Sequence, residues 1–226
     1  MEIELFLNDL CPYCQRVTIV ARHLGIAHQA TPINLGNRPE WLAEISPQST
    51  VPAMRFGTTA IFDSSVINEF LNDRAGGTML PSDPLARALC RAWINHAGHC
   101  QTQFTQCCLA ANENGFEIAK ETLLEALEKF EHGPLSRAAE GFNGPTLSLV
   151  DAAMAPLFTR IAHVGAQLPI LPEEGLERIR TWSDRLLHEP AVLASIPEKF
   201  SLMFKMFLKN RAAGGPVAAR MLVETA

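Results

Sequence analysis

The sequence has no uninterrupted apolar run of about 18 residues, which is the length that a membrane-spanning helix needs. It also lacks an excess of basic residues, because 19 Lys and Arg against 24 Asp and Glu leave a formal net charge of −5. A general nucleic-acid or membrane-surface binder needs a positive field, so we expect neither partner. The start, MEIELFLNDL, lacks the basic flank and cleavage site of a signal peptide, and we therefore expect a cytoplasmic location.

Cysteine is too scarce for a disulfide scaffold, with six in 226 residues. Two of these cysteines, Cys11 and Cys14, form a C-x-x-C motif in the segment NDLCPYCQRV. No second C-x-x-C follows it, and a structural zinc site needs about four ligands, so we expect no metal. In a reducing compartment a lone C-x-x-C is more often catalytic than structural, although a structural pair remains the alternative.

What the chain does contain is enough apolar residues, 47%, to bury a core. Residues 1–77 predict an α/β domain in which a small sheet is flanked by helices. Strands are indicated over 3–7, 28–35, 50–56 and 59–63. Helices are indicated from Pro12 to Gly25, over 38–45 and from Ser64 onward. Two glycines and two prolines in GGTMLPSDP (76–84) then break the periodicity, and we place a domain boundary there.

Residues 85–226 predict an all-α domain, because no convincing strand pattern follows the boundary. Helical patterns cover 85–109, 116–130, 148–164, 175–187 and 191–208. Ser148 and Asp151 have the spacing of a capping box, in which each side chain satisfies a free backbone N–H at the helix start. We interpret this pair as structural and not as catalytic.

Cys11 stands directly before Pro12, at the predicted start of the first helix, where proline is favoured. The free N–H groups and the partial positive charge of a helix start stabilise a thiolate, so the pKa of Cys11 should fall toward neutrality. Arg16 and Arg22 would add positive charge nearby. Cys14 lies one turn further in, and we expect it to be less exposed, with a higher pKa and a resolving or bystander role.

Several segments together resemble the cytosolic glutathione transferases, most closely their cysteine-type members, which include omega-like and bacterial glutaredoxin-like proteins. These segments are CPYCQR (11–16), INLGNRPEW (33–41), STVPAM (49–54), DSSVINEFL (63–71) and LSLVDAAMAPLF (147–158). The resemblance covers essentially the whole chain. It implies a thioredoxin-like first domain, glutathione as co-substrate, a homodimer, and a helical second domain that supplies the acceptor site.

By resemblance, Cys11 is the catalytic residue and Cys14 a possible resolving thiol. The residues that would contact glutathione are Tyr13, Arg38, Val51, Pro52, Asp63 and Ser64. Arg38 would pair with the glycyl carboxylate, and Tyr13 would pack near the sulfur. The family's Val-Pro peptide is cis, and its backbone pairs with glutathione as an added strand does. Asp63 and Ser64 would hold the γ-glutamyl group, although they also fit an ordinary helix cap.

The function that the resemblance implies is glutathione-dependent thiol transfer, or deglutathionylation, through a mixed disulfide between Cys11 and glutathione. The acceptor would be a small hydrophobic or thiol-conjugated molecule. The alternative is a non-enzymatic glutathione-binding or protein-interaction member of the fold, channel-like or stress-protein-like. Trp93, His96, Cys100 and Phe104 form a stripe on one predicted helix face, which lines the acceptor site, the core or a dimer contact. The sequence assigns no role to His99, Cys107 or Cys108.

Overall fold

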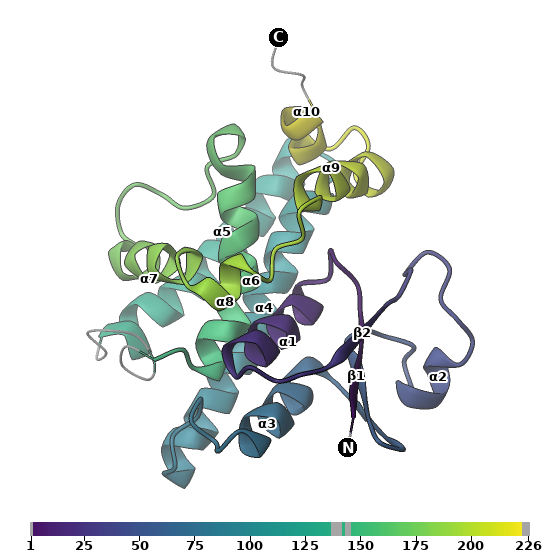
Figure 1. Ribbon diagram of the computed structural model, residues 1–226. Helices are drawn as coiled ribbons and strands as arrows, with labels where there is room; N and C mark the ends of the chain where they lie inside the picture. The colour runs from purple at the N-terminus through teal and green to yellow at the C-terminus, as the bar shows by residue number, and fades with distance from the viewer. Residues whose placement is uncertain (1, 137–141, 143–145, 223–226) are drawn as a thin grey trace.

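The computed structural model describes residues 2–136, 142 and 146–222, and it begins with a four-stranded mixed sheet flanked by helices (Figure 1). The strands are β1 (Ile3–Leu7), β2 (Gln29–Pro32), β3 (Ala53–Phe56) and β4 (Thr59–Phe62). Their order in the sheet is β2-β1-β3-β4, with β2 parallel to β1 and the other neighbours antiparallel. The helices of this part are α1 (Pro12–His23), α2 (Leu42–Ile45) and α3 (Ser64–Arg74). The predicted order of elements is confirmed.

The two faces of the sheet are buried in different clusters, because successive side chains of a strand point to opposite faces. Leu5 of β1 and Met54 of β3 pack with α1 and α3 in the large core, whereas Phe6 and Ala53 pack with residues of the α2 side. The strands are therefore covered on both faces. The large core continues without a break into the helical part, so the division into domains 1–77 and 85–226 stays a prediction.

The rest of the described chain consists of helices and their connections, apart from a single extended residue at Phe142. Its helices are α4 (Pro84–Leu109), α5 (Glu113–His132), α6 (Leu149–Val164), α7 (Glu177–Leu187), α8 (Pro190–Leu193), α9 (Phe200–Arg211) and α10 (Pro216–Leu222), with 3-10 turns η1 (Pro134–Ser136) and η2 (Gly165–Gln167). An α/β part followed by an all-α part is the predicted fold class. Within the described ranges, no helix is long and apolar enough to cross a membrane.

The predicted helix over 191–208 is wrong, because the chain forms two helices there, α8 and α9, with a break between them. Pro197 lies in the break, and a proline inside a helix removes a backbone hydrogen bond and clashes with the preceding turn. The short helix α10 follows Gly214 and Gly215 and has no counterpart in the prediction. The break turns α9 across the top of the molecule, above the start of α1 (Figure 1).

The predicted capping box at the start of α6 is present, and it belongs to a larger buried network. Ser148 Oγ accepts a hydrogen bond from Asp151 N at 3.1 Å, and Asp151 Oδ2 accepts one from Ser148 N at 2.8 Å. The other oxygen of the fully buried carboxylate accepts from Trp182 Nε1 and from Arg185 Nη2, each at 2.6 Å. The structural interpretation of this pair is thus confirmed, and it joins α6 to α7.

Polar side chains of α1 join the sheet part to α6 and to the segment after α8. Arg16 Nε donates to Ala153 O at 3.0 Å, and Gln15 Nε2 donates to Ser195 Oγ at 3.1 Å. Gln15 and Arg16 are buried, and a buried polar group needs such partners. These bonds hold the first helix, and the cysteine at its start, against the helical part.

Candidate active site

Cys11 is the N-cap residue of α1, with extended backbone angles of φ −73° and ψ 119°. Pro12 follows as the first helical residue, as the sequence predicts. In its thiol form the Cys11 side chain donates a hydrogen bond from Sγ to Val51 O at 3.7 Å. Cys11 is half-buried, and it lines a cavity between the two parts of the chain.

The pKa of Cys11 is lowered from its ordinary value to about 7. The largest cause is a hydrogen bond from the Cys14 thiol, and burial acts in the opposite direction. The backbone N–H groups of Cys14 and Tyr13 and the positive charge of Arg160 lower the pKa further. A thiol with this pKa is about half ionised at neutral pH, and the thiolate is the nucleophilic form.

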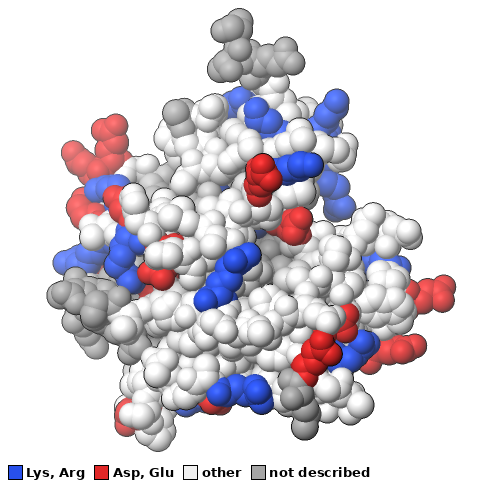
Figure 2. Space-filling model, viewed as in Figure 1, with Lys and Arg blue, Asp and Glu red and all other residues white. Residues whose placement is uncertain are grey.

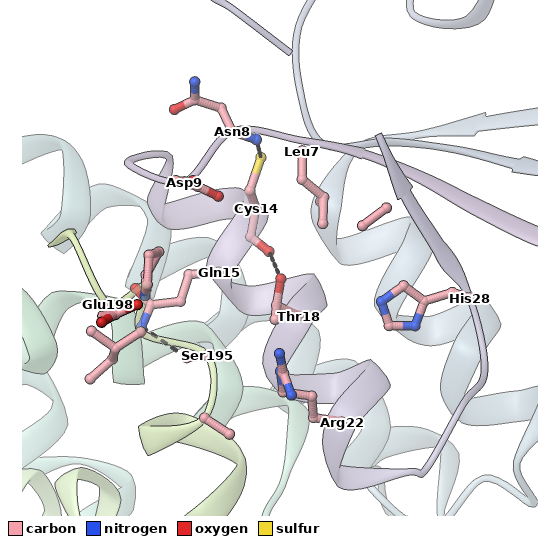
Figure 3. Close-up of a pocket in the computed structure, with 14 residues that line it drawn as sticks. Leu7, Asn8, Asp9, Cys14, Gln15, Thr18, Arg22, His28, Ser195 and Glu198 are labelled. Carbon is pink, nitrogen blue, oxygen red and sulfur yellow. Dashed lines mark hydrogen bonds between the residues drawn. The ribbon is translucent and has the colours of Figure 1, made fainter. Parts of the chain in front are cut away.

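Cys14 has the opposite environment, since it is only 2% exposed and burial strongly raises its pKa. Its Sγ accepts a hydrogen bond from Asn8 N at 3.3 Å, as Figure 3 shows. The same side chain lines a second cavity of about 390 Å³ beside α1, together with Thr18 and His28, and Cys11 does not line that cavity. The predicted contrast in pKa between Cys11 and Cys14 is therefore present.

Arg160 of α6 is the cation beside Cys11, and the sequence analysis missed it. Its Nη2 donates to Leu10 O at 2.8 Å, and its Nη1 donates to Gln15 Oε1 at 2.7 Å. The expectation that Arg22 would add to this charge is wrong, because Arg22 lies in the last turn of α1, far along the helix from its start. Arg16 does interact electrostatically with Cys11, as the sequence predicts. Arg16 is buried with its guanidinium 4.9 Å from the centre of the Tyr13 ring.

The cavity in front of Cys11 measures about 530 Å³. Leu35 and Arg38 line it from the loop after β2, Arg160 lines it from α6, and α4 and α9 close the remaining sides. Side chains from the latter two helices are Gln101, Phe104, Thr105, Cys108, Phe204, Phe207 and Arg211. A small molecule that enters this cavity reaches the Cys11 sulfur between an apolar wall and several guanidinium groups.

The structure brings most of the predicted glutathione contacts to Cys11. Tyr13 and Arg38 line the same cavity, and Val51 O faces the Cys11 sulfur. The Val51–Pro52 peptide bond is cis, as the resemblance implies. Arg38 is exposed, and its Nη1 donates to Ser49 O at 3.2 Å.

Asp63 and Ser64 do not line the Cys11 cavity, but they directly follow the end of β4, the strand that pairs with β3. The last pair of the β3–β4 ladder is Ala53 with Phe62, so Pro52 and Asp63 are the next residues on their strands. Asp63 has a positive φ of 72° and caps α3, with its Oδ1 accepting from Ser65 N at 2.8 Å. The cap interpretation is therefore present in the structure, and Ser64 is buried beside it.

The stripe on α4 contributes only its last residue to the cavity. Phe104 lines the cavity, whereas Trp93 and His96 pack in an aromatic cluster around Phe130. Cys100 is fully buried in the core. The four stripe residues therefore do not line an acceptor site together, because the long helix α4 passes the cavity only near its C-terminal end.

The other cysteines are buried free thiols within the described chain. Burial raises the pKa of Cys100 and of Cys107 to about 12 and also raises the pKa of Cys108. Protonated, buried thiols are inert, so Cys11 is the reactive one in this set. Across residues 2–136, 142 and 146–222, no three His, Cys, Asp or Glu side chains gather in a way that would hold a metal ion.

Comparisons with known proteins place the fold and the site in context. Residues 10–74 match the family model "Glutathione S-transferase, N-terminal domain". Over 194 residues the chain is 26% identical to glutathione S-transferase omega-1 of Sus scrofa, which covers 85% of this chain and 79% of that protein. It is also 28% identical over 199 residues to a stringent starvation protein A homolog of Haemophilus influenzae, covering 87% and 91%.

Among solved structures, the crystal structure of glutathione transferase Omega 3C from Trametes versicolor superposes with a TM-score of 0.73. The identity is 25%, and the match covers 86% of this chain and 89% of that chain. Each of these matches covers more than four fifths of the chain, so each takes in residues of both the sheet part and the helical part. Residues 10–74 thus resemble a glutathione S-transferase N-terminal domain, and the chain as a whole is similar to omega-class glutathione S-transferases.

Proposed function

We propose that the protein is a glutathione-dependent thiol transferase that removes glutathione from its substrates through a mixed disulfide at Cys11. The observation that carries this proposal is the lowered pKa of Cys11, about 7, at the start of a helix and at the wall of a cavity. A cysteine in this state attacks sulfur at neutral pH. We also propose a cytoplasmic location, because reduced glutathione and free thiols persist there.

The glutathione site that we propose runs from Arg38 past Val51 to the start of α3. Arg38 would pair with the glycyl carboxylate, since its guanidinium lines the Cys11 cavity and is exposed. The extended peptide would add to the backbone at Val51 and Pro52 as an extra strand does. The γ-glutamyl group would reach Asp63 and Ser64, where a carboxylate and helix N–H groups meet its two charges.

In the first chemical step, the Cys11 thiolate attacks the glutathionyl sulfur of a mixed disulfide between glutathione and the substrate. The Cys11–glutathione disulfide forms, the substrate's S–S bond breaks, and the substrate leaves as a thiolate that takes a proton from solvent. In the second step, the thiolate of a second glutathione attacks this disulfide. The products are oxidised glutathione and the Cys11 thiolate, so one glutathione and one mixed disulfide give oxidised glutathione and one free thiol.

We propose the monothiol route for the release step. Cys14 lies close enough to Cys11 to donate a hydrogen bond to it, so a dithiol route is not blocked by distance. Burial nevertheless raises the pKa of Cys14, and a protonated thiol is a poor attacking group. Cys14 then acts as the hydrogen-bond donor that stabilises the Cys11 thiolate, while a second glutathione resolves the intermediate.

The second candidate function is a non-enzymatic one, either glutathione binding or protein interaction. The similarity to a stringent starvation protein A homolog favours it, because that match covers as much of the chain as the omega-1 match does. The lowered pKa of Cys11 favours the enzyme. Turnover separates the two candidates, since a binding protein would hold glutathione without exchanging it.

The test is a glutathione-dependent assay with the mixed disulfide of glutathione and 2-mercaptoethanol, which is small and neutral outside its glutathione part. We expect steady reduction, and we expect intact-mass analysis after treatment with oxidised glutathione to find one glutathionyl group, mapped to Cys11. A protein that binds glutathione but shows neither turnover nor this adduct would be the non-enzymatic member of the fold.

We further propose that the protein is a homodimer, as the family resemblance implies. Four large apolar side chains lie exposed along β4, α3 and the start of α4, namely Phe62, Val66, Leu85 and Leu89, with exposed fractions of 50%, 55%, 71% and 54%. Ion pairs such as Arg91 with Glu69 join α3 to α4. Exposed apolar surface of this kind commonly marks an association surface.

A double variant, Leu85→Asp with Leu89→Asp, is expected to be monomeric, because two buried charges would oppose association. Analytical ultracentrifugation should find the wild type at twice the chain mass of 24.8 kDa and the variant at one chain mass. Leu202→Asp is the matched control, since this exposed leucine lies on α9 outside the surface. A wild type that sediments as a monomer at micromolar concentration would exclude this dimer.

A further inference from the structure

The segment that forms α9 and α10 carries a strongly one-sided charge. Between residues 199 and 222 the basic residues are Lys199, Lys205, Lys209, Arg211 and Arg220, and no Asp or Glu occurs there. The whole chain has a net charge of −5, so this end of the molecule differs from the average. Figure 2 shows basic side chains gathered over α9 and α10.

The cavity in front of Cys11 is also lined by positively charged side chains. Its described lining contains Arg38, Arg160 and Arg211, and it contains no Asp or Glu. Arg160 is already bonded to Leu10 O and Gln15, and we assign Arg38 to glutathione. Arg211, at the end of α9, is exposed and has no ion pair or side-chain hydrogen bond with any residue in the described ranges. It is the cation of the cavity that is left for a second molecule.

Part of the cavity wall is aromatic. Phe104 contributes from α4, and Phe204 and Phe207 contribute from α9. The latter two rings are stacked, with centres 6.2 Å apart and planes inclined by 30°. Aromatic side chains favour an aromatic guest through offset or edge-to-face packing. The cavity of about 530 Å³ falls in the range of small-molecule sites.

We propose that the acceptor half of the substrate is an aromatic carboxylate, whose ring packs on the phenylalanines and whose carboxylate faces Arg211. This inference rests on the proposed function, because it takes the glutathione half to lie at Arg38 and Val51. The preferred substrate is then a mixed disulfide of glutathione with an aromatic acid that carries a thiol. A neutral aromatic group fits the same wall but leaves Arg211 without a partner.

Two thioether probes test this inference without turnover, since neither has a disulfide for Cys11 to attack. They are S-(4-carboxybenzyl)glutathione and its methyl ester at the benzyl carboxyl, and calorimetry measures the affinity of each. We expect the carboxylate to bind about fivefold to tenfold more tightly than the ester, as befits a partly exposed charge-assisted pair. This ratio should shrink as salt is added.

Arg211→Gln should bring the affinity ratio of the two probes close to one. Lys209→Gln is the matched control, because Lys209 is an exposed cation of the same helix and does not line the cavity. It should leave the ratio unchanged. Arg38→Gln should weaken both probes alike, since both carry the same glycyl carboxylate.

Equal affinities for the two probes in the wild type would overturn the proposal that the acceptor is an aromatic carboxylate, while the proposed glutathione site would stand. A ratio that survives Arg211→Gln, or one that falls as much in Lys209→Gln, would also overturn the role of Arg211. If neither probe binds, the glutathione site itself fails and this inference fails with it. Turnover of the neutral 2-mercaptoethanol disulfide tells these cases apart, because it reports on Cys11 and glutathione alone.

Discussion

Cys11→Ser is expected to lower kcat/KM for glutathione-dependent reduction of the 2-mercaptoethanol mixed disulfide by about a thousandfold or more. The serine hydroxyl stays protonated near neutral pH and does not attack sulfur. The binding of glutathione should change little, because Arg38 and the backbone at Val51 are untouched by the substitution. The measurement is steady-state kinetics combined with calorimetry of glutathione binding.

Cys90→Ser is the control for this experiment. Cys90 is a buried thiol of α4 that does not line the Cys11 cavity. We expect it to keep wild-type activity, which would show that the loss in Cys11→Ser comes from the nucleophile and not from removing any cysteine. Substantial thiol transfer by Cys11→Ser would contradict the assignment of Cys11, and the non-enzymatic candidate would then gain weight.

Cys14→Ala should raise the pKa of Cys11, because the hydrogen bond from the Cys14 thiol is the largest cause of its lowering. Loss of one such bond to a charged group corresponds to about one pKa unit. Cys14→Ser is the matched variant, since its hydroxyl also donates a hydrogen bond and should hold the pKa near that of the wild type. The rate of iodoacetamide alkylation of Cys11 as a function of pH measures both values.

The sign of the pH effect follows from the thiolate being the reactive form. Activity of the wild type should rise with pH through an inflection near 7 and then level off, because the pKa of Cys11 is lowered to about 7. In Cys14→Ala the inflection moves upward, so the variant loses about tenfold below pH 7 and little above pH 9. An unchanged inflection in Cys14→Ala would show that this hydrogen bond does not stabilise the thiolate.

The same pair of variants separates the two release routes. Under the monothiol route, Cys14→Ser keeps turnover, because a second glutathione performs the release. Under a dithiol route, Cys14→Ser and Cys14→Ala both stop after the first step and accumulate the Cys11–glutathione disulfide. Intact-mass analysis during turnover distinguishes the two outcomes.

Local patterns in the sequence predicted the part of the site that depends on neighbours along the chain. Cys11 before Pro12 is enough to place a cysteine at a helix start, and the capping box predicts the start of α6. The strand at 3–7 and the hairpin around Gly57 follow from apolar runs and a turn residue in the same way. These features involve residues within a few positions of one another.

The cation beside Cys11 could not be found in this way, because Arg160 lies about 150 positions further along the chain. Only the packing of α6 against α1 brings Arg160 to Leu10 O. The one available signal was its place in a mostly apolar helix, where a charged residue calls for a buried partner. The role of the α4 stripe stayed open for a related reason, since helical spacing shows a shared face but not what that face contacts.

The most direct test of the account is the pH dependence of Cys11 alkylation in the wild-type protein, with peptide mapping to identify the modified residue. The account predicts that Cys11 is the first cysteine to react and that its rate has an inflection near pH 7. An inflection at the ordinary cysteine value of about 8.5 or above, or faster modification of another cysteine, would contradict it.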